Sequence, residues 1–212
     1  MSNDSVIAGQ LKWKDLTVNK IFLIESLLTI LFLIIILFSL ARFLNFVEAR
    51  SGVIIPDPLL SLINPVDLTW VIFGFIYSSL LIAIIALIKD PFRLLTAIQV
   101  YCIMIVLRMA VMFVTPLEPP ANMISLRDPF VEYFGTGQLL TKDLFFSGHT
   151  ATLFLLYLVA VGKQLKIFFL ISTIIVAVSV LLQHVHYTID VLSAPLFAYI
   201  SFWVLHFVKR KR

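Results

Sequence analysis

Long apolar stretches separated by short polar breaks set the pattern of this chain. A run of about 20 apolar residues is the length that spans about 30 Å of hydrocarbon as a helix. The pattern therefore predicts an all-α membrane protein, a six-transmembrane-helix bundle. The expected spans are roughly 21–41, 68–88, 93–114, 144–162, 165–187 and 189–208.

Composition agrees with that pattern, because 61% of the residues are hydrophobic and only 13% are charged. This excludes an ordinary soluble domain. We divide the chain into an N-terminal segment 1–20, a transmembrane domain 21–208 and a basic tail 209–212. The first 20 residues are polar and of mixed charge, so they do not resemble a secretory signal peptide. The only cysteine, Cys102, cannot form an internal disulfide.

The basic residues predict the orientation of the bundle. Eleven of the sixteen Lys and Arg residues fall on one side of the expected spans, in the N-terminal segment, the short connections and the tail. Four fall on the other side, and Arg108 lies within a span. The positive-inside rule then places both termini in the cytoplasm and the two long loops, 42–67 and 115–143, on the opposite side.

Four polar groups interrupt the apolar pattern. His149 opens the fourth span, His186 closes the fifth, Asp190 opens the sixth, and Arg108 lies seven residues before the end of the third. Ionisable groups within a span are costly and usually have a partner or a function. The topology places all four on the non-cytoplasmic side, with Arg108 about 10 Å below that surface at about 1.5 Å per residue.

His186 and Asp190 are four residues apart. If the turn between the last two spans is helical, they share a face, and the carboxylate can fix the tautomer of the imidazole and stabilise its protonated form. Such an imidazole is a better nucleophile or base. The alternative is a His–Asp pair that only caps two helices.

The segment around the fourth span start reads Ser147-Gly148-His149. Ser147 suits a helix N-cap, Gly148 allows close approach to the backbone, and a helix N-terminus attracts phosphate. His149 beside it is placed to protonate a leaving alkoxide. The alternative is a capped helix start with an interfacial histidine.

The other two histidines are not assigned to the site. His184 is two positions from His186 and on a helix points to the other side, so we expect a packing or surface residue. His206 lies near the cytoplasmic end, where we expect an interfacial position. No closely spaced pair of ligands suggests a metal, so we expect neither a metal nor another cofactor.

The segments KDLFFSGHTATLFLLYL, HVHYTIDV and RMAVMFVTPLEPP carry a resemblance. They are similar to the lipid phosphatase/phosphotransferase superfamily, also called the type 2 phosphatidic acid phosphatase (PAP2) superfamily, and most of all to its sphingomyelin synthase branch. The resemblance covers about residues 90–195. It implies a PAP2-like catalytic domain within the transmembrane bundle.

The phosphatases of that superfamily carry an arginine at two positions where this chain has Thr115 and Val180. Fewer cations suit a phosphodiester better than a doubly charged monoester. The resemblance therefore implies transfer of a phospho-headgroup from a phospholipid donor to ceramide or a diacylglycerol-type acceptor.

In this mechanism His186, oriented by Asp190, forms a phosphohistidine, and His149 acts as acid and then base. The substrate-binding candidates are Arg108, Ser147, Gly148, Tyr187 and Asp143, the last for a cationic headgroup. The membrane is the expected environment, no nucleic acid is expected as a partner, and the sequence does not give the oligomeric state.

Two other hypotheses remain. A lipid phosphatase acting on phosphatidate or prenyl diphosphate would use water as its acceptor. A non-catalytic transporter or scaffold would place polar groups near the middle of the bilayer, whereas three of the four groups here lie at span ends. In the leading hypothesis the active site is on the non-cytoplasmic side, which is periplasmic in a bacterium and luminal or extracellular in a eukaryote.

Overall fold

The computed structural model describes residues 19–127 and 139–210, and within these ranges the chain is helical with connecting loops. Residues 1–18 of the predicted N-terminal segment and 211–212 of the predicted tail lie outside the described residues. The helices are α2 (Lys20–Ala49), the short 3₁₀ turn η1 (Leu60–Leu62), α3 (Thr69–Leu87), α4 (Pro91–Val114), α6 (Gly148–Val159), α7 (Lys163–Leu182) and α8 (Thr188–Arg210).

Five of the helices described are long and apolar enough to cross a membrane, and they indicate an integral membrane protein. The exception is α6, which has 12 residues and a length of about 18 Å at about 1.5 Å per residue. That is shorter than a hydrocarbon core of about 30 Å. The all-α fold is confirmed, and the count of six spans stays a prediction.

The boundaries of three expected spans were wrong. The first helix continues to Ala49, beyond the expected end at residue 41, and the fourth occupies only 148–159 of the expected 144–162. The fifth ends at Leu182 instead of residue 187, because the chain turns there and His184 adopts a φ of 56°. His186 therefore lies in a turn between two helices and not on one.

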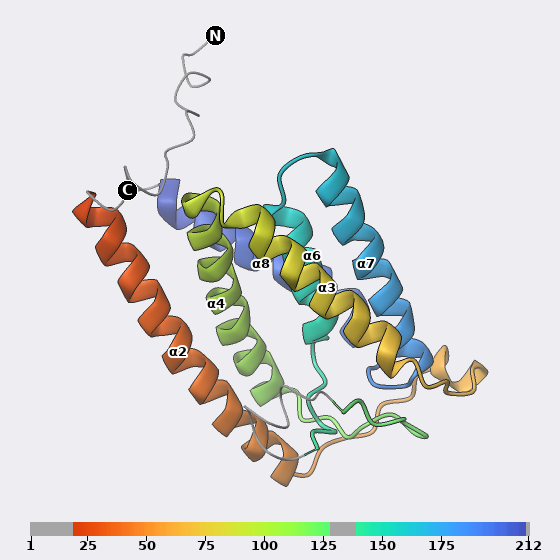
Figure 1. Ribbon diagram of the computed structural model, residues 1–212. Coiled ribbons are helices and arrows are strands. Elements are labelled where there is room, and N and C mark those ends of the chain that lie inside the picture. The colour runs from red at the N-terminus through yellow and green to blue at the C-terminus, as the bar shows by residue number, and fades with distance from the viewer. Residues whose placement is uncertain (1–18, 128–138, 211–212) are drawn as a thin grey trace.

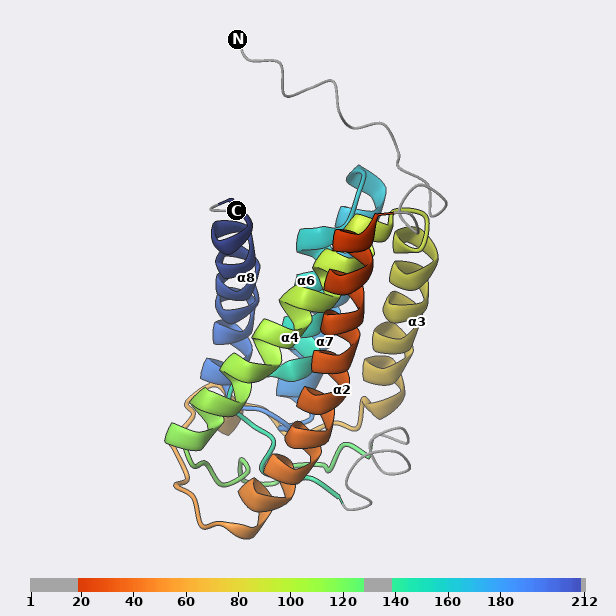
Figure 2. The same ribbon diagram turned by 90° about the vertical axis from the view of Figure 1, so that its left-hand side faces the viewer.

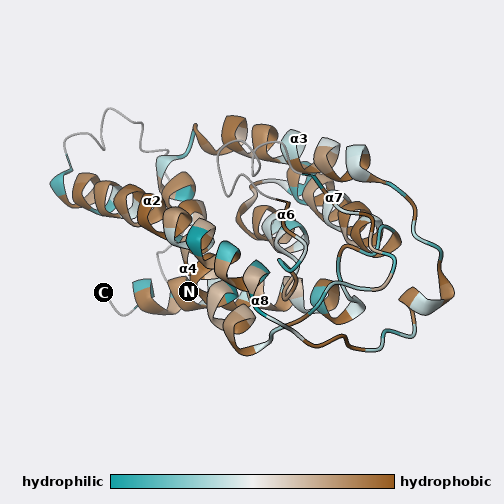
Figure 3. Ribbon diagram, turned by 90° about the horizontal axis from the view of Figure 1, so that it is seen from below, coloured by the Kyte–Doolittle hydropathy of each residue, from teal (hydrophilic) through white to brown (hydrophobic). Residues whose placement is uncertain are grey.

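The short helix α6 lies at the centre of the bundle (Figures 1 and 3). It packs mainly against α7 and α8, while α2 packs on α4 and α3 packs on α7. Small buried residues permit the close approach of α6 and α8, among them Ala151, Ala194 and Ala198. Since protein surrounds it, α6 need not reach both faces of a bilayer.

The two described ends of the chain lie at one end of the bundle (Figure 1). Lys209 near the end of α8 is 3.4 Å from Glu25 near the start of α2. That both ends share one side is as expected, and its assignment to the cytoplasm stays a prediction.

The opposite end of the bundle carries the loops (Figure 2). Residues 50–68, 115–127 and 139–147 are named the loop layer here. Val53 and Leu117 pair as an isolated β-bridge within it. Gly52 fits there because an added Cβ would collide with the backbone of Leu117. Thus the layer is tied together by its own backbone.

Candidate active site

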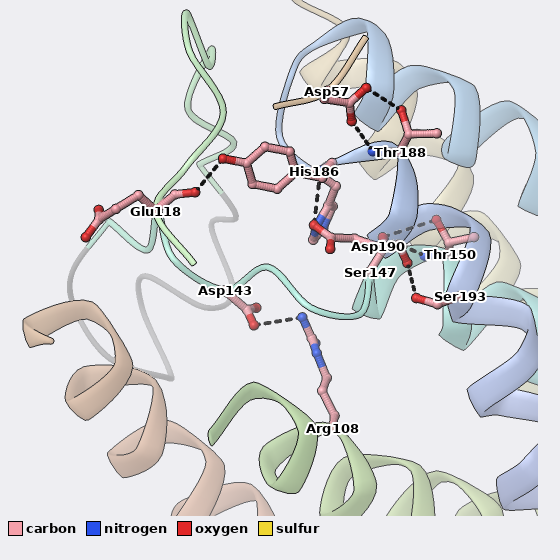
Figure 4. A network of polar contacts seen from close by, with 11 residues as sticks. Asp57, Arg108, Glu118, Asp143, Ser147, Thr150, His186, Thr188, Asp190 and Ser193 are labelled. Atoms are coloured by element: carbon pink, nitrogen blue, oxygen red, sulfur yellow. Dashed lines mark hydrogen bonds and ion pairs between the residues drawn. The ribbon is translucent and has the colours of Figure 1, made fainter. Parts of the chain in front are cut away.

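His186 and Asp190 form a buried pair below the loop layer (Figure 4). The His186 Nδ1 is 3.6 Å from the Asp190 Oδ2, and the two side chains are 1% and 0% exposed. The same Oδ2 accepts a hydrogen bond of 3.0 Å from the Tyr187 N–H. This reach-back from the first helical turn to the residue before the helix is half of a capping box. It fixes the carboxylate on the side of the imidazole ring that carries Nδ1.

The turn that carries His186 is fixed by Gln183, which is fully buried. The Gln183 Oε1 accepts from the Leu68 N–H, and its Nε2 donates to the Thr69 hydroxyl and the Ile124 carbonyl. The backbone of Gln183 also accepts from the Ile124 N–H at 3.1 Å. The turn is thereby attached to the start of α3 and to the loop layer.

His149, at the start of α6, faces His186. Their ring centroids are 6.5 Å apart with planes inclined by 64°, and His149 also meets the Phe73 ring edge-on at 6.4 Å. Both histidines line the same cavity, so one phosphoryl group bound there can contact both rings.

The starts of α6 and α8 are joined by a direct hydrogen bond, which fixes the position of His149 relative to His186. The Ser147 N–H donates to the Asp190 carbonyl at 3.2 Å. The Ser147 hydroxyl caps α6 by accepting from the Thr150 N–H, and it also contacts the Thr150 hydroxyl. Ser147 is completely buried.

Arg108 brings a positive charge to the start of α6. Its guanidinium lies against Gly148 so closely that an added Cβ there would collide with Nη1 and Cζ. Its Nη2 donates to the Asp143 Oδ1 at 2.7 Å, with the two side chains 13% and 26% exposed. The glycine is thus explained by the approach of Arg108, and a helix N-terminus and a guanidinium converge on one point.

These groups form the polar end of a cavity of about 510 Å³. Five of them line it: Arg108, Asp143, Gly148, His149 and His186. The rest of the wall is mostly apolar and comes from α2, α3, α4 and α6, with Leu33, Leu37, Leu80, Ile84, Leu94, Ala97 and Leu156 among the lining residues. The cavity therefore has one charged end and one hydrocarbon-like end.

Two predicted substrate-binding residues do not line this cavity. Tyr187 is 1% exposed, and its hydroxyl donates to the Glu118 carbonyl at 3.0 Å, which anchors it in the loop layer. Ser147 is occupied in capping α6. The structure thus gives both side chains a structural position behind the site. His184 likewise contacts the Ala121 carbonyl and not the cavity, in agreement with its expected place outside the site.

Asp143 is held in place by neighbouring contacts in the loop layer. Glu48, in the unexpected last turns of α2, accepts hydrogen bonds from the N–H groups of Thr141 and Lys142. The Lys142 ammonium forms an ion pair of 2.9 Å with Glu118. The hydrogen bond from the Lys142 ammonium, with one from the Gly52 N–H, lowers the pKa of Glu118 below its ordinary value of 4.5.

Two tyrosines that the sequence analysis overlooked also line the cavity, Tyr77 on α3 and Tyr101 on α4. A signal existed for one of them. Tyr101 lies seven residues before Arg108, which is two helical turns, so both project from one face of α4. No such relation links Tyr77 to the predicted site.

In the described part of the chain, no three His, Cys, Asp or Glu residues are grouped so that they could hold a metal ion. That no cofactor takes part stays a prediction.

Comparison with known families finds a match for part of the chain. Residues 142–207 match the family described as PAP2 superfamily C-terminal. The matched segment contains His149, His186 and Asp190 but covers only about a third of the chain. The match supports the PAP2 superfamily, typically enzymes acting as phosphatases or phosphotransferases, without selecting the sphingomyelin synthase branch. No curated protein matches this chain.

Proposed function

We propose that this protein is a lipid headgroup phosphotransferase of the sphingomyelin synthase type. It would move a headgroup such as phosphocholine or phosphoethanolamine from a glycerophospholipid to ceramide or a related lipid alcohol. The observation that carries the proposal is the facing pair His149 and His186 at the charged end of an apolar cavity.

In the first step His186 attacks the phosphorus of the donor. Because its Nδ1 is directed at Asp190, the opposite nitrogen, Nε2, is the one that forms the bond. The bond between phosphorus and the diacylglycerol oxygen breaks, and its electron pair leaves with that oxygen. Protonated His149 donates a proton to it, so neutral diacylglycerol departs. The headgroup remains on His186, whose positive ring is balanced by the Asp190 carboxylate.

In the second step the acceptor alcohol replaces the diacylglycerol. His149, now neutral, takes the proton of the acceptor hydroxyl as its oxygen attacks phosphorus. The bond between phosphorus and nitrogen breaks and returns the electron pair to His186. Both histidines then regain their starting protonation states, and the product is a new phosphodiester.

Arg108 supplies the charge that such a reaction needs at phosphorus. The guanidinium and the start of α6 act on the same point, and both favour negative charge as it develops on the phosphoryl oxygens. Asp143 holds Arg108 and lines the cavity, where its carboxylate would favour a cationic headgroup.

The shape of the cavity supports a lipid as the substrate. Its wall follows α4 from Arg108 to Leu94, which is about 21 Å at about 1.5 Å per residue. The wall beyond the charged end consists almost entirely of aliphatic and aromatic side chains. An acyl chain fits such a surface, whereas a water-soluble phosphate ester would leave it unfilled.

The phosphatase alternative differs in its acceptor, which would be water. The two positions at which the phosphatases carry arginine hold no cation here. Val180 lies in the apolar core, and the Thr115 hydroxyl donates to the Val111 carbonyl. This small number of cations favours the transferase. A single guanidinium paired with a carboxylate suits a phosphate that carries one negative charge. In this proposal the site faces the non-cytoplasmic side of the membrane.

The deciding experiment mixes purified protein with labelled ceramide, labelled diacylglycerol and a panel of phospholipid donors in micelles, with phosphatidate as a separate substrate. Mass spectrometry identifies the products, and free phosphate is assayed in parallel. A new ceramide or diacylglycerol phosphodiester supports the proposal. Phosphate release without headgroup transfer assigns the phosphatase function instead.

A further inference from the structure

The start of α8, the helix that carries Asp190, is fixed by contacts with the loop layer. Tyr187 precedes the first helical residue, and its hydroxyl is bonded to the Glu118 carbonyl. The Tyr187 carbonyl accepts from the N–H groups of Asp190 and Val191, as at a helix start. The N–H of Thr188, one of the first in the helix, therefore needs an acceptor from elsewhere.

Asp57 supplies that acceptor from the loop layer (Figure 4). Its Oδ2 accepts from the Thr188 N–H at 2.7 Å, and its Oδ1 accepts from the Thr188 hydroxyl at 3.0 Å. The two residues are 131 positions apart in the chain. A carboxylate at this place also balances the positive end of the α8 dipole.

The carboxylate is itself held rigidly. Its Oδ1 accepts from the N–H groups of Leu59 and Leu60, at 3.0 and 3.2 Å, at the start of the η1 turn. Partial burial raises the pKa of Asp57, but these bonds and those from Thr188 outweigh it, so the pKa lies below the ordinary 3.8. The group is therefore ionised at neutral pH, as its four donors require.

We propose that Asp57 is a positioning residue for the proposed transfer reaction, acting through Thr188 to hold the start of α8 and thereby the Asp190 carboxylate against His186. The proposal rests on the function proposed above. Asp57 does not line the cavity, so it would act on the reaction step and not on lipid binding.

The test compares Asp57→Asn with Asp90→Asn. In Asp57→Asn the side chain keeps only one acceptor oxygen and cannot satisfy both the η1 turn and Thr188. Asp90 also accepts from a backbone N–H at a helix start, that of Arg93 on α4 at 3.2 Å. It lies eighteen residues before Arg108, about 27 Å along α4 at about 1.5 Å per residue, so it is a matched control remote from the site.

The expected result for Asp57→Asn is a fall in kcat of about 10- to 100-fold with an unchanged KM for the donor lipid. Asp57→Glu, which keeps an ionised acceptor, recovers part of kcat, and Asp90→Asn behaves as wild type. An unchanged kcat in Asp57→Asn overturns the proposal, as does an equal loss in both Asn variants or no recovery with Glu.

A second readout does not depend on activity. Amide hydrogen exchange of the wild-type protein and both Asn variants in micelles reports on residues 184–195. Exchange there should rise in Asp57→Asn alone, and equal exchange in all three proteins overturns the positioning role. If the wild type shows this pattern of protection but no lipid transfer or hydrolysis, the proposed function fails while the structural link stands.

Discussion

Among single residues, His186 and Asp190 offer the sharpest test of the chemistry. His186→Ala removes the proposed nucleophile, and Asp190→Asn removes the charge that orients it. Each should lower turnover by about 10³-fold or more, because the two residues act as one catalytic unit and the loss of either removes most of its effect. The measurement is steady-state transfer in mixed micelles, with folding checked by gel filtration.

His184→Asn is the appropriate control for that pair. It alters a buried histidine two residues away, and Asn tolerates the φ of 56° that Ala would resist. Near wild-type turnover is expected, since His184 contacts the Ala121 carbonyl and not the cavity. Equal loss in all three variants would contradict the assigned roles.

Gly148 tests the position of Arg108. In Gly148→Ala the new methyl group occupies space that the guanidinium now fills, so Arg108 must move from the start of α6. We expect kcat/KM to fall by about 10-fold or more, as a misplaced charge stabilises the reacting phosphate less well.

Gly74→Ala is the matched control, because an added Cβ on α3 at that position meets no atom within 4 Å. Its activity should equal that of wild type, and its thermal midpoint should be the same or slightly higher, since Ala suits a helix better than Gly. Full activity of Gly148→Ala in the same assay would remove Arg108 from the proposed mechanism.

For whole elements, the sequence predicted the six α-helices of the described residues and, to within two residues, the ends of α3, α4 and α8. The end of α2, both ends of α6 and the end of α7 were wrong, because an apolar run does not show where backbone capping begins or ends a helix. The fourth helix starts late because Ser147 caps it, a residue that the sequence already marked as a suitable N-cap. The fifth helix ends early at Gln183, whose amide bonds to Leu68, Thr69 and Ile124. The partners of Gln183 are distant in the sequence, so this end could not be predicted from it.

The loop layer should respond to acid. The pKa values of Asp57 and Glu118 lie below their ordinary values of 3.8 and 4.5 in the folded protein. Their stabilisation is therefore present above those ordinary values and is lost as the pH falls through the lower folded pKa values. Thermal midpoints measured from about pH 7 to about pH 3.5 should decline most steeply at the acid end.

Glu118→Gln isolates one contribution to that decline. The variant has no titrating carboxyl beside Lys142, so its thermal midpoint at neutral pH should be lower than that of the wild type. Its midpoint should also fall by a smaller amount when the pH is lowered. Parallel curves for the two proteins would mean that this ion pair does not contribute to the acid response.

For the whole molecule, topology predicted the convergence of the site but not its cavity. The alternation of spans was enough to place Arg108, His149, His186 and Asp190 at one end of the bundle, where the structure has them. The cavity is built from side chains of four helices, and its volume depends on packing that no single helix specifies. Its apolar end was therefore found only in the structure, and it leads to a prediction about the substrate.

Ala97→Phe should shorten the cavity without touching its charged end. Ala97 lines the wall eleven residues before Arg108, about 16 Å away along α4 at about 1.5 Å per residue. A phenyl ring there should raise KM for a long-chain donor while leaving a short-chain donor unaffected, because only the long chain reaches that depth. The control is Ala110→Phe, on the same helix but exposed and outside the cavity. Transfer assays with dipalmitoyl and dioctanoyl donors compare the variants, and an equal effect on both donors would show that the acyl chain does not occupy this cavity.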